Sequence, residues 1–416
     1  MPETETDRTG VTSFARLGVG EDLIELLSDR GIDEPFPVQT LTIPDGLAGR
    51  DVCGRAQTGS GKTLAFGIPV IERTSDAGAQ HPGALILVPT RELCVQVSEE
   101  LRPLAGIRGL TLVSVYGGAP MRKQIDRLKR GADVIVATPG RLIDLAGRNT
   151  VSLSGVETVV IDEADQMADM GFLPQVHQIM RKVEGSPQVM LFSATLDGQV
   201  HSLVTRYLND PVRHEVEVKS DLVETQTHRF LSVHFRDKAK VAARIISGVS
   251  RTLVFVSTKR GADRVASDLR AEGVDALAIH GDLRQSDRER RLQRFSGGSL
   301  EALVATNLAS RGLHIDDVDV VLHYDPPQDY KAFVHRSGRT ARAGESGLVV
   351  TLVEWDQVEE VQRLQRASGL HFEIVKVFSN DARLDDLGGF EPEVVEMKRT
   401  SDVELSRRFR SRRRRR

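Results

Sequence analysis

Residues 158–165 read Thr-Val-Val-Ile-Asp-Glu-Ala-Asp, so an apolar run leads directly into two adjacent carboxylates, Asp162 and Glu163. An apolar run this short predicts a strand that is buried on both faces of a parallel sheet. The carboxyl end of such a strand is where open α/β sheets bind their ligands. A metal-bound nucleotide needs both groups, one carboxylate to hold Mg²⁺ and one to orient water. Acidic residues also favour helix N-termini, so the stretch alone leaves both interpretations open.

The composition of the 416-residue chain predicts a cytoplasmic protein of roughly two or three domains. Hydrophobic residues make up 40% of the chain, which is enough to build real cores. Its two cysteines, Cys53 and Cys94, argue against a disulfide framework and against a structural zinc site. The sequence shows neither a long apolar segment nor a signal-peptide pattern, so we expect no membrane association. We also expect the chain to act as a monomer.

Short β-branched runs alternate with longer amphipathic segments along most of the chain. Val134 to Ala137 and Thr252 to Val256 are two such runs, and 91–104 is a helical segment. This alternation predicts βαβ units and parallel sheets. It stops near Pro211 and resumes after a charged stretch, 212–227, which we interpret as a linker. The sequence therefore predicts two α/β domains at 14–211 and 228–372, followed by a disordered basic tail at 373–416.

Residues 56–63 read Ala-Gln-Thr-Gly-Ser-Gly-Lys-Thr and match a phosphate-binding loop except at the first position, where Ala56 replaces glycine. Such a loop wraps phosphates with backbone N–H groups, which requires glycines. Lys62 would contact the β- and γ-phosphates, and the Thr63 hydroxyl would bind Mg²⁺ together with Asp162. The nucleotide contacts predicted for the loop come from Thr58, Gly59, Ser60, Gly61, Lys62 and Thr63.

The phosphate-binding loop, the acidic run and further motifs resemble, in content and order, those of a DEAD-box ATP-dependent RNA helicase of the bacterial type. The resemblance covers residues 14 to about 353. It implies two tandem RecA-like domains, each a parallel sheet flanked by helices, that use ATP and Mg²⁺ to unwind short RNA duplexes locally, or to remodel RNA–protein complexes, with little sequence preference. It also implies that Gln39 reads the adenine edge, that Ile32 packs on the base and that Phe14 supports this segment.

Three loops of the first domain resemble the family's RNA-contacting loops, and each follows an expected strand. Contacts of this kind fix a position on the RNA backbone without reading its sequence. The residues that the resemblance assigns to RNA here are Arg91, Gly118, Thr138 and Arg141. It further implies that the hydroxyls of Ser193 and Thr195 bond Asp165 and so couple the nucleotide site to RNA.

In the second domain, segments 280–288, 305–315 and 335–344 match family motifs. The resemblance makes Arg339 and Arg342 arginine fingers, which reach the γ-phosphate when the domains close. The residues assigned to RNA are Arg288 and Thr306, those assigned to the nucleotide are Gly312 and His314, and those assigned to closure are His335 and Arg336. The implied catalytic set is Glu163, Lys62, Asp162, Arg339 and Arg342.

Two positions depart from the family pattern on the face that would meet ATP. Asn307 and His314 each stand where the family usually has aspartate. A neutral imidazole at His314 can still accept one hydrogen bond from a ribose hydroxyl. The departures motivate an alternative function, an ATP-gated RNA clamp or annealer with weak unwinding. The Gln39 segment and the Asp-Glu-Ala-Asp run argue against a third interpretation, a DNA translocase of the same superfamily.

The end of the chain carries eight arginines, Arg407, Arg408, Arg410 and Arg412 to Arg416, in a segment with little apolar content. A segment of this kind can tether RNA electrostatically, or it can only keep the end of the chain in solution. The sequence leaves these two roles open.

Overall fold

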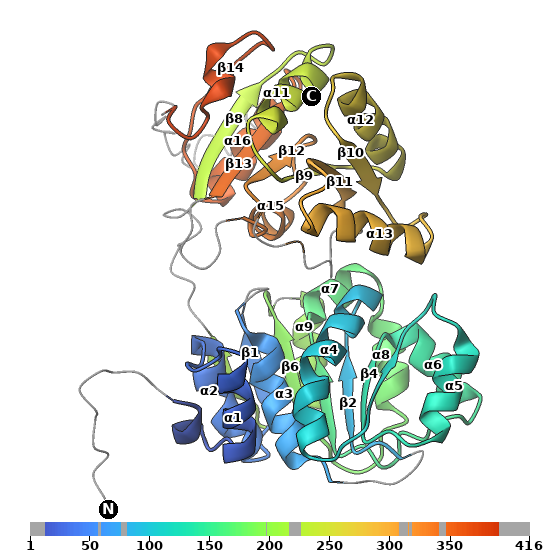
Figure 1. Ribbon diagram of the computed structural model, residues 1–416. Helices are drawn as coiled ribbons and strands as arrows, with labels where there is room; N and C mark the ends of the chain where they lie inside the picture. The colour runs from blue at the N-terminus through green and yellow to red at the C-terminus, as the bar shows by residue number, and fades with distance from the viewer. Residues whose placement is uncertain are drawn as a thin grey trace, which may run out of the picture. The chain divides into compact units, whose positions relative to one another are not determined.

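A computed structural model describes residues 13–56, 60–75, 81–196, 198–215, 226–307, 315, 318–340 and 347–390. The chain divides into two compact units, and the boundary falls within residues 216–225, which are outside the described ranges. Each unit is a parallel sheet flanked by helices, which confirms the predicted α/β class (Figure 1). None of the described helices combines the length and the apolar character needed to cross a bilayer.

The first unit is built on a seven-stranded parallel sheet in the order β3-β4-β2-β5-β6-β1-β7. Its strands are β1 Val52–Arg55, β2 Ala84–Leu87, β3 Leu112–Val115, β4 Val134–Ala137, β5 Thr158–Ile161, β6 Gln188–Ser193 and β7 Val212–Glu215. The apolar run that precedes Asp162 forms β5, the central strand, which pairs with β2 and β6. Every side chain of β5 is buried, as an unbroken apolar run predicts.

Helices cover both faces of this first sheet. They are η1 Phe14–Leu17, α1 Glu21–Asp29, α2 Pro37–Leu47, α3 Lys62–Arg73, α4 Arg91–Ile107, α5 Met121–Lys129, α6 Pro139–Gly147, α7 Ala164–Asp169, α8 Leu173–Met180 and α9 Gly198–Tyr207. Helices α1 to α4 share one hydrophobic core, and α5 to α9 share the other. Successive β5 side chains serve opposite cores, with Val160 in the first and Val159 and Ile161 in the second.

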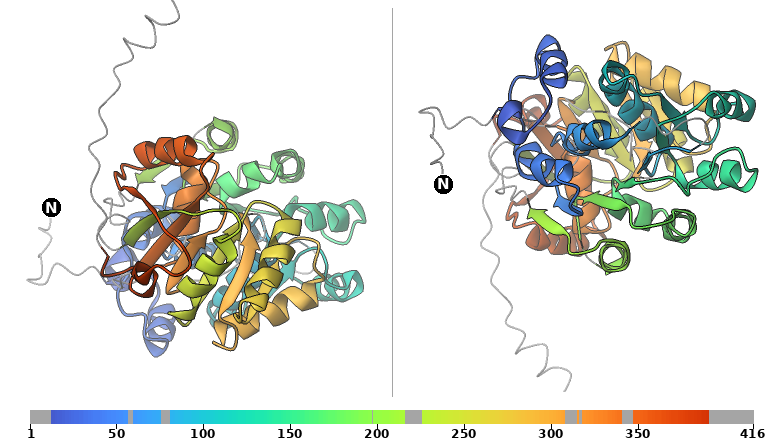
Figure 2. Two further views of the ribbon diagram at one scale, coloured as in Figure 1. Left: turned by 90° about the horizontal axis from the view of Figure 1, so that it is seen from above. Right: turned by 90° about the horizontal axis from the view of Figure 1, so that it is seen from below.

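The second unit repeats this architecture with the strand order β10-β11-β9-β12-β13-β8-β14. Its strands are β8 Gln226–Ser232, β9 Thr252–Val256, β10 Ala276–Ile279, β11 Ala302–Thr306, β12 Val320–His323, β13 Gly347–Val353 and β14 Ile374–Lys376. Its helices are α11 Lys238–Ser247, α12 Lys259–Ala271, α13 Gln285–Ser296, α15 Tyr330–Ser337, α16 Val358–Ala367 and η2 Ala382–Asp385. Helices α11 and α12 line one core and α15 and α16 line another, on opposite faces of the sheet in the view from above in Figure 2.

The first unit extends into the predicted linker, contrary to the sequence prediction. Strand β7 pairs with β1 at the edge of the sheet, and its side chains are half-buried or exposed. His214 Nε2 lies 2.6 Å from Asp45 Oδ2, and Glu215 pairs with Arg55. Because backbone pairing and polar contacts hold this strand, it carries no apolar alternation from which to predict it.

The second unit extends into the predicted tail, which is a second correction. Strand β14 pairs with β8, and η2 follows it. The buried apolar residues of this segment, which join the core lined by α11 and α12, are Val375, Val377, Leu384 and Leu387. They are few and irregularly spaced, so tertiary contacts rather than local pattern fix the segment. The arginine-rich end lies in residues 391–416, outside the described residues.

Candidate functional site

The carboxyl edge of the first sheet brings the phosphate-binding loop next to the acidic turn. Lys62 begins α3, and the two carboxylates follow β5, with β6 as the strand between β1 and β5. The Lys62 Nζ lies 2.8 Å from Glu163 Oε1 and 4.0 Å from Asp162 Oδ1. All three side chains are buried. The two motifs therefore form a single charged cluster inside the protein.

Burial controls the charge balance of this cluster. The pKa of Asp162 is raised, chiefly because burial penalises its carboxylate, although the nearby Lys62 ammonium works against this. Burial lowers the pKa of Lys62, but the carboxylates of Glu163 and Asp162 more than offset it, and the pKa stands above its ordinary value. Asp165, which is fully buried, adds a third carboxylate. One ammonium among three carboxylates favours the binding of a further cation.

The donor atoms at this edge fit Mg²⁺. The Asp162 carboxylate and the Thr63 hydroxyl are hard oxygen donors, and Mg²⁺ takes one or two carboxylates and completes its shell with water and phosphate oxygens. Within the described ranges, no group of three or more His, Cys, Asp or Glu side chains could hold a metal by itself. These residues therefore suit an ion that is shared with a nucleotide, rather than a metal centre built from protein ligands alone.

Glu163 adopts a strained backbone conformation, with φ 51° and ψ 49°, as the N-cap of α7. A residue other than glycine is uncommon in this left-handed region, and such strain concentrates at functional sites. The Glu163 N–H donates to Asp162 Oδ1 at 2.9 Å, which stabilises the turn. The strained turn keeps both carboxylates beside Lys62.

Gln39 links the predicted adenine segment to the phosphate-binding loop. Its Nε2 donates to the Gly61 carbonyl at 3.0 Å, and its Oε1 accepts from the Phe36 N–H at 2.8 Å. Gly61 has φ +85°, and a Cβ there would lie only 2.5 Å from Gln39 Nε2. An amide oxygen and an amide nitrogen can each form two hydrogen bonds, which is what reading an adenine edge requires.

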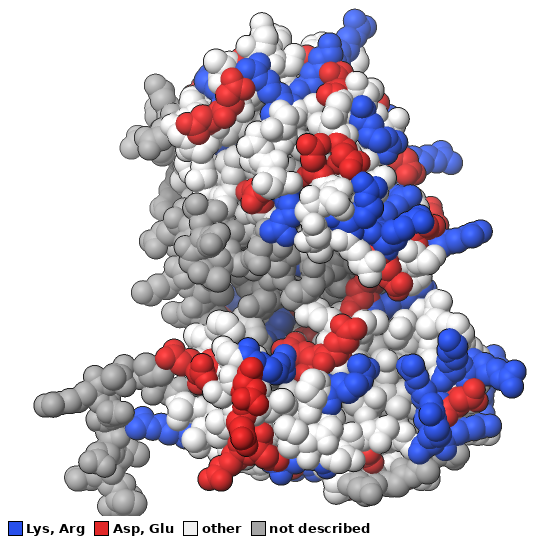
Figure 3. Space-filling view, in the orientation of Figure 1, with Lys and Arg blue, Asp and Glu red and all other residues white. Residues whose placement is uncertain are grey.

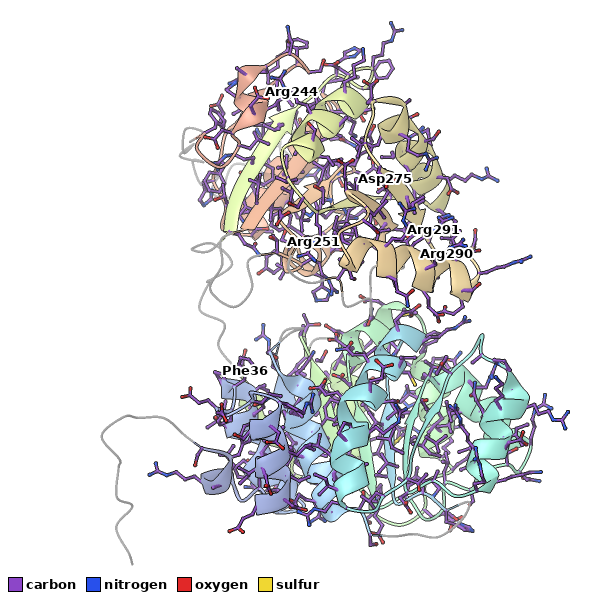
Figure 4. All side chains as sticks on the ribbon, viewed as in Figure 1. Phe36, Arg244, Arg251, Asp275, Arg290 and Arg291 are labelled. Atoms are coloured by element: carbon purple, nitrogen blue, oxygen red, sulfur yellow. The ribbon has the colours of Figure 1, made fainter. Side chains whose placement is uncertain are left out.

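The aromatic residue that is available beside this segment is Phe36, to which sequence analysis gave no role. Phe36 is 54% exposed, and its ring would contact a Cβ placed on Gly61 (Figure 4). Phe14 is buried in the core, and the half-buried Ile32 packs against that core. The exposure of Phe36 could not be read from its neighbours in the sequence, because it depends on how α2 packs against α3.

Asp165 meets both hydroxyl groups that were expected to bond it. The Asp165 N–H donates to Ser193 Oγ at 3.2 Å, and Thr195 Oγ1 donates to Asp165 Oδ2 at 3.3 Å. Asp165 and Ser193 are fully buried. The contact joins the end of β5 to the end of β6, while its role in coupling stays a prediction.

The first-unit residues assigned to RNA also gather, because β3, β4 and β2 are neighbours and their loops share one edge. The Arg91 side chain lies against Gly118, where a Cβ would come within 2.0 Å of its Nη1. Arg141 Nη1 donates to the Ala119 carbonyl at 3.2 Å. Thr138 is the buried N-cap residue of α6. The structure therefore brings these four residues together around the loop between β3 and α5.

Basic side chains continue from this loop onto α5. Figure 3 shows Lys and Arg gathered over this part of the first unit. The exposed basic residues of α5 and its C-cap are Arg122, Lys123, Arg127, Lys129 and Arg130. A concentration of positive charge beside the predicted RNA contacts favours a polyanion.

In the second unit, Arg336 donates hydrogen bonds to two neutral oxygens. Its Nε donates to Asn307 Oδ1, and its Nη1 donates to the Asp325 carbonyl at 2.9 Å. The guanidinium carbon lies 5.1 Å from the centroid of the Phe255 ring. Asn307, which departs from the family pattern, thus still supplies an oxygen acceptor for this arginine.

The remaining predicted residues fall into two groups. Those that the structure places are Ser60 before α3, Arg288 on α13, Thr306 at the end of β11, His335 on α15 and the buried Arg339 just after α15. Those that lie outside the described residues are Thr58, Gly59, Gly312, His314 and Arg342. Each unit is described by itself, so the predicted meeting of the two sets stays a prediction.

Comparison with known proteins identifies the family. The family model of the DEAD/DEAH box helicase matches residues 36–203, and that of the helicase conserved C-terminal domain matches residues 237–344. The chain is 38% identical over 377 residues to the DEAD-box ATP-dependent RNA helicase CshA of Geobacillus kaustophilus, and the match covers 90% of this chain and 80% of that relative. The chain belongs to the DEAD-box ATP-dependent RNA helicases.

This DEAD-box helicase is an ATP-hydrolysing enzyme by family. It is also 37% identical over 399 residues to CshA of Bacillus subtilis, covering 95% of this chain and 80% of the relative. It is similar in structure to S. cerevisiae Dbp5 bound to RNA and ADP BeF3, with 26% identity and a TM-score of 0.76 over 89% of this chain and 96% of Dbp5. The match confirms the predicted tandem RecA-like architecture.

Proposed function

We propose that this helicase hydrolyses ATP at the cluster around Lys62 and uses the reaction to separate short RNA duplexes. The observation that carries the proposal is the buried ion pair of Lys62 and Glu163, with 2.8 Å between Nζ and Oε1. This ion pair puts Lys62, the residue assigned to the phosphates, in direct contact with Glu163, the residue assigned to the attacking water. Asp162 and Thr63 would hold Mg²⁺, which would neutralise phosphate charge when bound.

Exchange of the Lys62 partner follows from this arrangement. The triphosphate carries more negative charge than a single carboxylate, so the β- and γ-phosphates draw Lys62 away from Glu163. The Glu163 carboxylate, no longer paired with Lys62, accepts a hydrogen bond from water and orients it for in-line attack. Arg339 and Arg342 of the second unit neutralise the charge that develops in the transition state.

RNA binding reaches this site through the Asp165 contact. Arg91, Gly118, Thr138 and Arg141 of the first unit, with Arg288 and Thr306 of the second, hold the RNA backbone. Such contacts give little sequence preference and a strong dependence on salt. RNA bound at these loops then affects the position of Glu163 through the contacts among Asp165, Ser193 and Thr195, because Glu163 lies two residues before Asp165. His335 and Arg336 support closure of the two domains.

Steady-state ATP hydrolysis, measured with and without single-stranded RNA, tests the proposal. Glu163→Gln keeps the size of the side chain but removes the carboxylate, and we expect kcat to fall by about a hundredfold or more. Glu157→Gln, at an exposed position just before β5, is the matched control and should leave the rate unchanged. A Glu163→Gln variant with the normal rate, or a wild-type rate that RNA does not stimulate, would contradict the proposal.

The alternative function, an ATP-gated clamp or annealer with weak unwinding, rests on Asn307 and His314. Asn307 still accepts a hydrogen bond from Arg336, and we therefore favour unwinding. A strand-separation assay decides between them, because a clamp would retain RNA in the presence of ATP without separating strands.

We further propose that the chain acts as a cytoplasmic monomer. Sedimentation with and without RNA would test the oligomeric state.

A further inference from the structure

The second unit exposes three large aromatic side chains at one place. Trp355, the only tryptophan of the chain, is 82% exposed, Phe235 is 59% exposed and Phe378 is 50% exposed. They follow β13, β8 and β14, which are neighbours in the sheet (Figure 1). Exposed apolar rings gathered at one site mark an interaction surface more often than single exposed residues do.

The strand register puts the three aromatic loops at the same level. Val353 of β13 and Lys376 of β14 are both Cα partners of Ser232 in β8. The pairing continues one residue further, because the Val233 N–H donates to the Val353 carbonyl at 2.9 Å and the Val377 N–H donates to the Ser232 carbonyl at 3.1 Å. With strands about 4.8 Å apart, the loops leave the sheet within roughly 10 Å of one another.

Side-chain contacts fix these loops to one another. Lys238 Nζ donates to Glu354 Oε1 at 2.8 Å, which ties the loop after β8 to the loop after β13. Asp237 accepts from the Ser379 N–H at 2.7 Å and from its hydroxyl at 2.8 Å, which ties it to the loop after β14. Arg244 of α11 donates to the Ser379 carbonyl at 2.8 Å (Figure 4). The rings are therefore exposed but stand on a rigid base, which lowers the entropic cost of binding.

Two cations accompany the rings. The Arg236 guanidinium lies 5.5 Å from the centroid of the Phe235 ring, and the Lys376 ammonium lies 5.3 Å from that of Phe378. Both residues are exposed, and neither forms an ion pair within the part of the chain that the structure describes. Asp356, next to Trp355, is an exposed acid on the same surface. Unpaired cations against aromatic faces suit a ligand that is both anionic and planar.

We propose that Trp355, Phe235 and Phe378, with Arg236 and Lys376, form a platform that stacks the bases of single-stranded RNA. The aromatic rings would stack on the faces of the bases, and the two cations would bind the phosphates. Proteins bind single strands in this way without reading their sequence. The platform adds a second RNA contact that lies outside the residues proposed for ATP hydrolysis and for core RNA binding. RNA is favoured over a protein partner because the unpaired charges of these loops include two cations placed on the rings themselves.

The intrinsic fluorescence of the chain reports on this surface directly, because Trp355 is its only tryptophan. The full chain, without nucleotide, is titrated with a fluorescently labelled single-stranded RNA and with a ribose-phosphate chain of equal length that lacks bases. We expect the RNA to quench Trp355 and the abasic chain to have little effect at equal charge. Unchanged Trp355 fluorescence when anisotropy shows the RNA to be fully bound would overturn the proposal.

Substitutions separate the platform from the core site. Phe235→Ala and Phe378→Ala should each raise the Kd for a long single-stranded RNA about tenfold, while the RNA-stimulated kcat at saturating RNA stays normal. Trp355→Phe should keep most of the affinity that Trp355→Ala loses. Ile107→Ala, which removes an exposed apolar side chain from α4 of the first unit, is the control. An unchanged Kd in both phenylalanine variants would overturn the proposal.

Charge substitutions distinguish RNA from a protein occupant. Arg236→Gln and Lys376→Gln should weaken RNA binding and flatten its dependence on salt. Asp356→Asn should strengthen it, because the substitution removes a negative charge from beside the bases. Weaker or unchanged RNA binding by Asp356→Asn would overturn the proposal. The fluorescence and RNA-binding measurements need no ATP, so failure of the proposed ATPase chemistry would appear separately.

Discussion

The two units hold their central cations in different ways. In the first unit, Lys62 meets the buried carboxylates of Glu163 and Asp162. In the second unit, Arg336 is held by the Asn307 amide oxygen, the Asp325 backbone carbonyl and the Phe255 ring. Both cations are buried, so each needs partners; Lys62 pairs with carboxylates, whereas these partners of Arg336 are uncharged.

The two arrangements show two ways in which a buried cation can remain available to an anionic ligand. A carboxylate partner holds Lys62 firmly but cancels its charge until a stronger anion displaces the carboxylate. The Asn307 amide oxygen and the Asp325 backbone carbonyl help to fix the position of Arg336 without themselves cancelling its charge. We therefore expect the first unit to be most sensitive to the loss of charge, and the second to the loss of a single hydrogen-bond acceptor.

Lys62→Ala should have the largest effect. It removes the ammonium that pairs with the buried Glu163 and Asp162, and breaking a buried pair in this way costs about 3–5 kcal/mol. We expect ATP hydrolysis to be lost and the thermal midpoint of the first unit to fall, as read by calorimetry. A Lys62→Ala variant that melts like the wild type would show that the carboxylates do not depend on Lys62.

The loss of stability in Lys62→Ala should also depend on pH. Burial holds the pKa of Asp162 above its ordinary value, so the native state binds this proton more tightly than the unfolded state. The contribution of the Asp162 carboxyl to the free energy of unfolding is then largest at low pH. It declines as the pH rises above the ordinary pKa of an aspartate. Removing Lys62 makes this decline with pH steeper. The difference in free energy of unfolding between Lys62→Ala and the wild type should therefore increase from acidic to neutral pH, as measured in denaturant titrations.

Asn307 gives the second test, with a smaller expected effect. Asn307→Ala removes the oxygen that accepts from the Arg336 Nε, which should cost about 1–3 kcal/mol in the second unit. Asn307→Asp keeps an oxygen there and adds a charge, so it should be at least as stable as the wild type. Denaturant unfolding of both variants measures the difference. An Asn307→Ala variant as stable as the wild type would show that the neutral partners do not hold Arg336.

Sequence analysis was strongest where local pattern and chemistry agree. The apolar run before Asp162 predicted β5 and its burial on both faces, because a central parallel strand needs an unbroken run. The glycine spacing and Lys62 predicted the phosphate-binding loop, and the structure brings Lys62 to Glu163. The strand and the loop each depend on residues close together in the chain, so they can be read from the sequence, whereas the contact between Lys62 and Glu163 joins residues far apart.

Features that depend on distant contacts could not be predicted in the same way. Strand β7 is held by pairing with β1, and β14 by pairing with β8, so neither shows an apolar pattern of its own. The exposure of Phe36 depends on the packing of α2 against α3, and the exposure of Trp355 on the sheet edge at which β13 ends. Resemblance to a family also gave no reason to look at Phe235 or Phe378, because they lie outside its motifs.

Arg91 extends the comparison to a third case, and it carries the smallest expected effect. Within the described residues Arg91 forms no ion pair, and its side chain lies against Gly118, whose φ is +83°. Gly118→Ala adds a Cβ only 2.0 Å from Arg91 Nη1, so the arginine must move. We expect the Kd for single-stranded RNA to rise about three- to tenfold, with a slightly smaller salt dependence because one phosphate contact is lost.

The left-handed backbone itself adds a cost of about 1–2 kcal/mol when glycine is replaced by alanine, and this must be separated from the movement of Arg91. Gly109→Ala is the matched control, because Gly109 also has a positive φ, +69°, but a Cβ there meets nothing within 4 Å. Both variants should lose similar stability, and only Gly118→Ala should weaken RNA binding. Equal RNA affinities for the two variants would show that RNA binding does not depend on the contact between Arg91 and Gly118. The Arg91 side chain would then be mobile enough to reach the phosphate from another conformation.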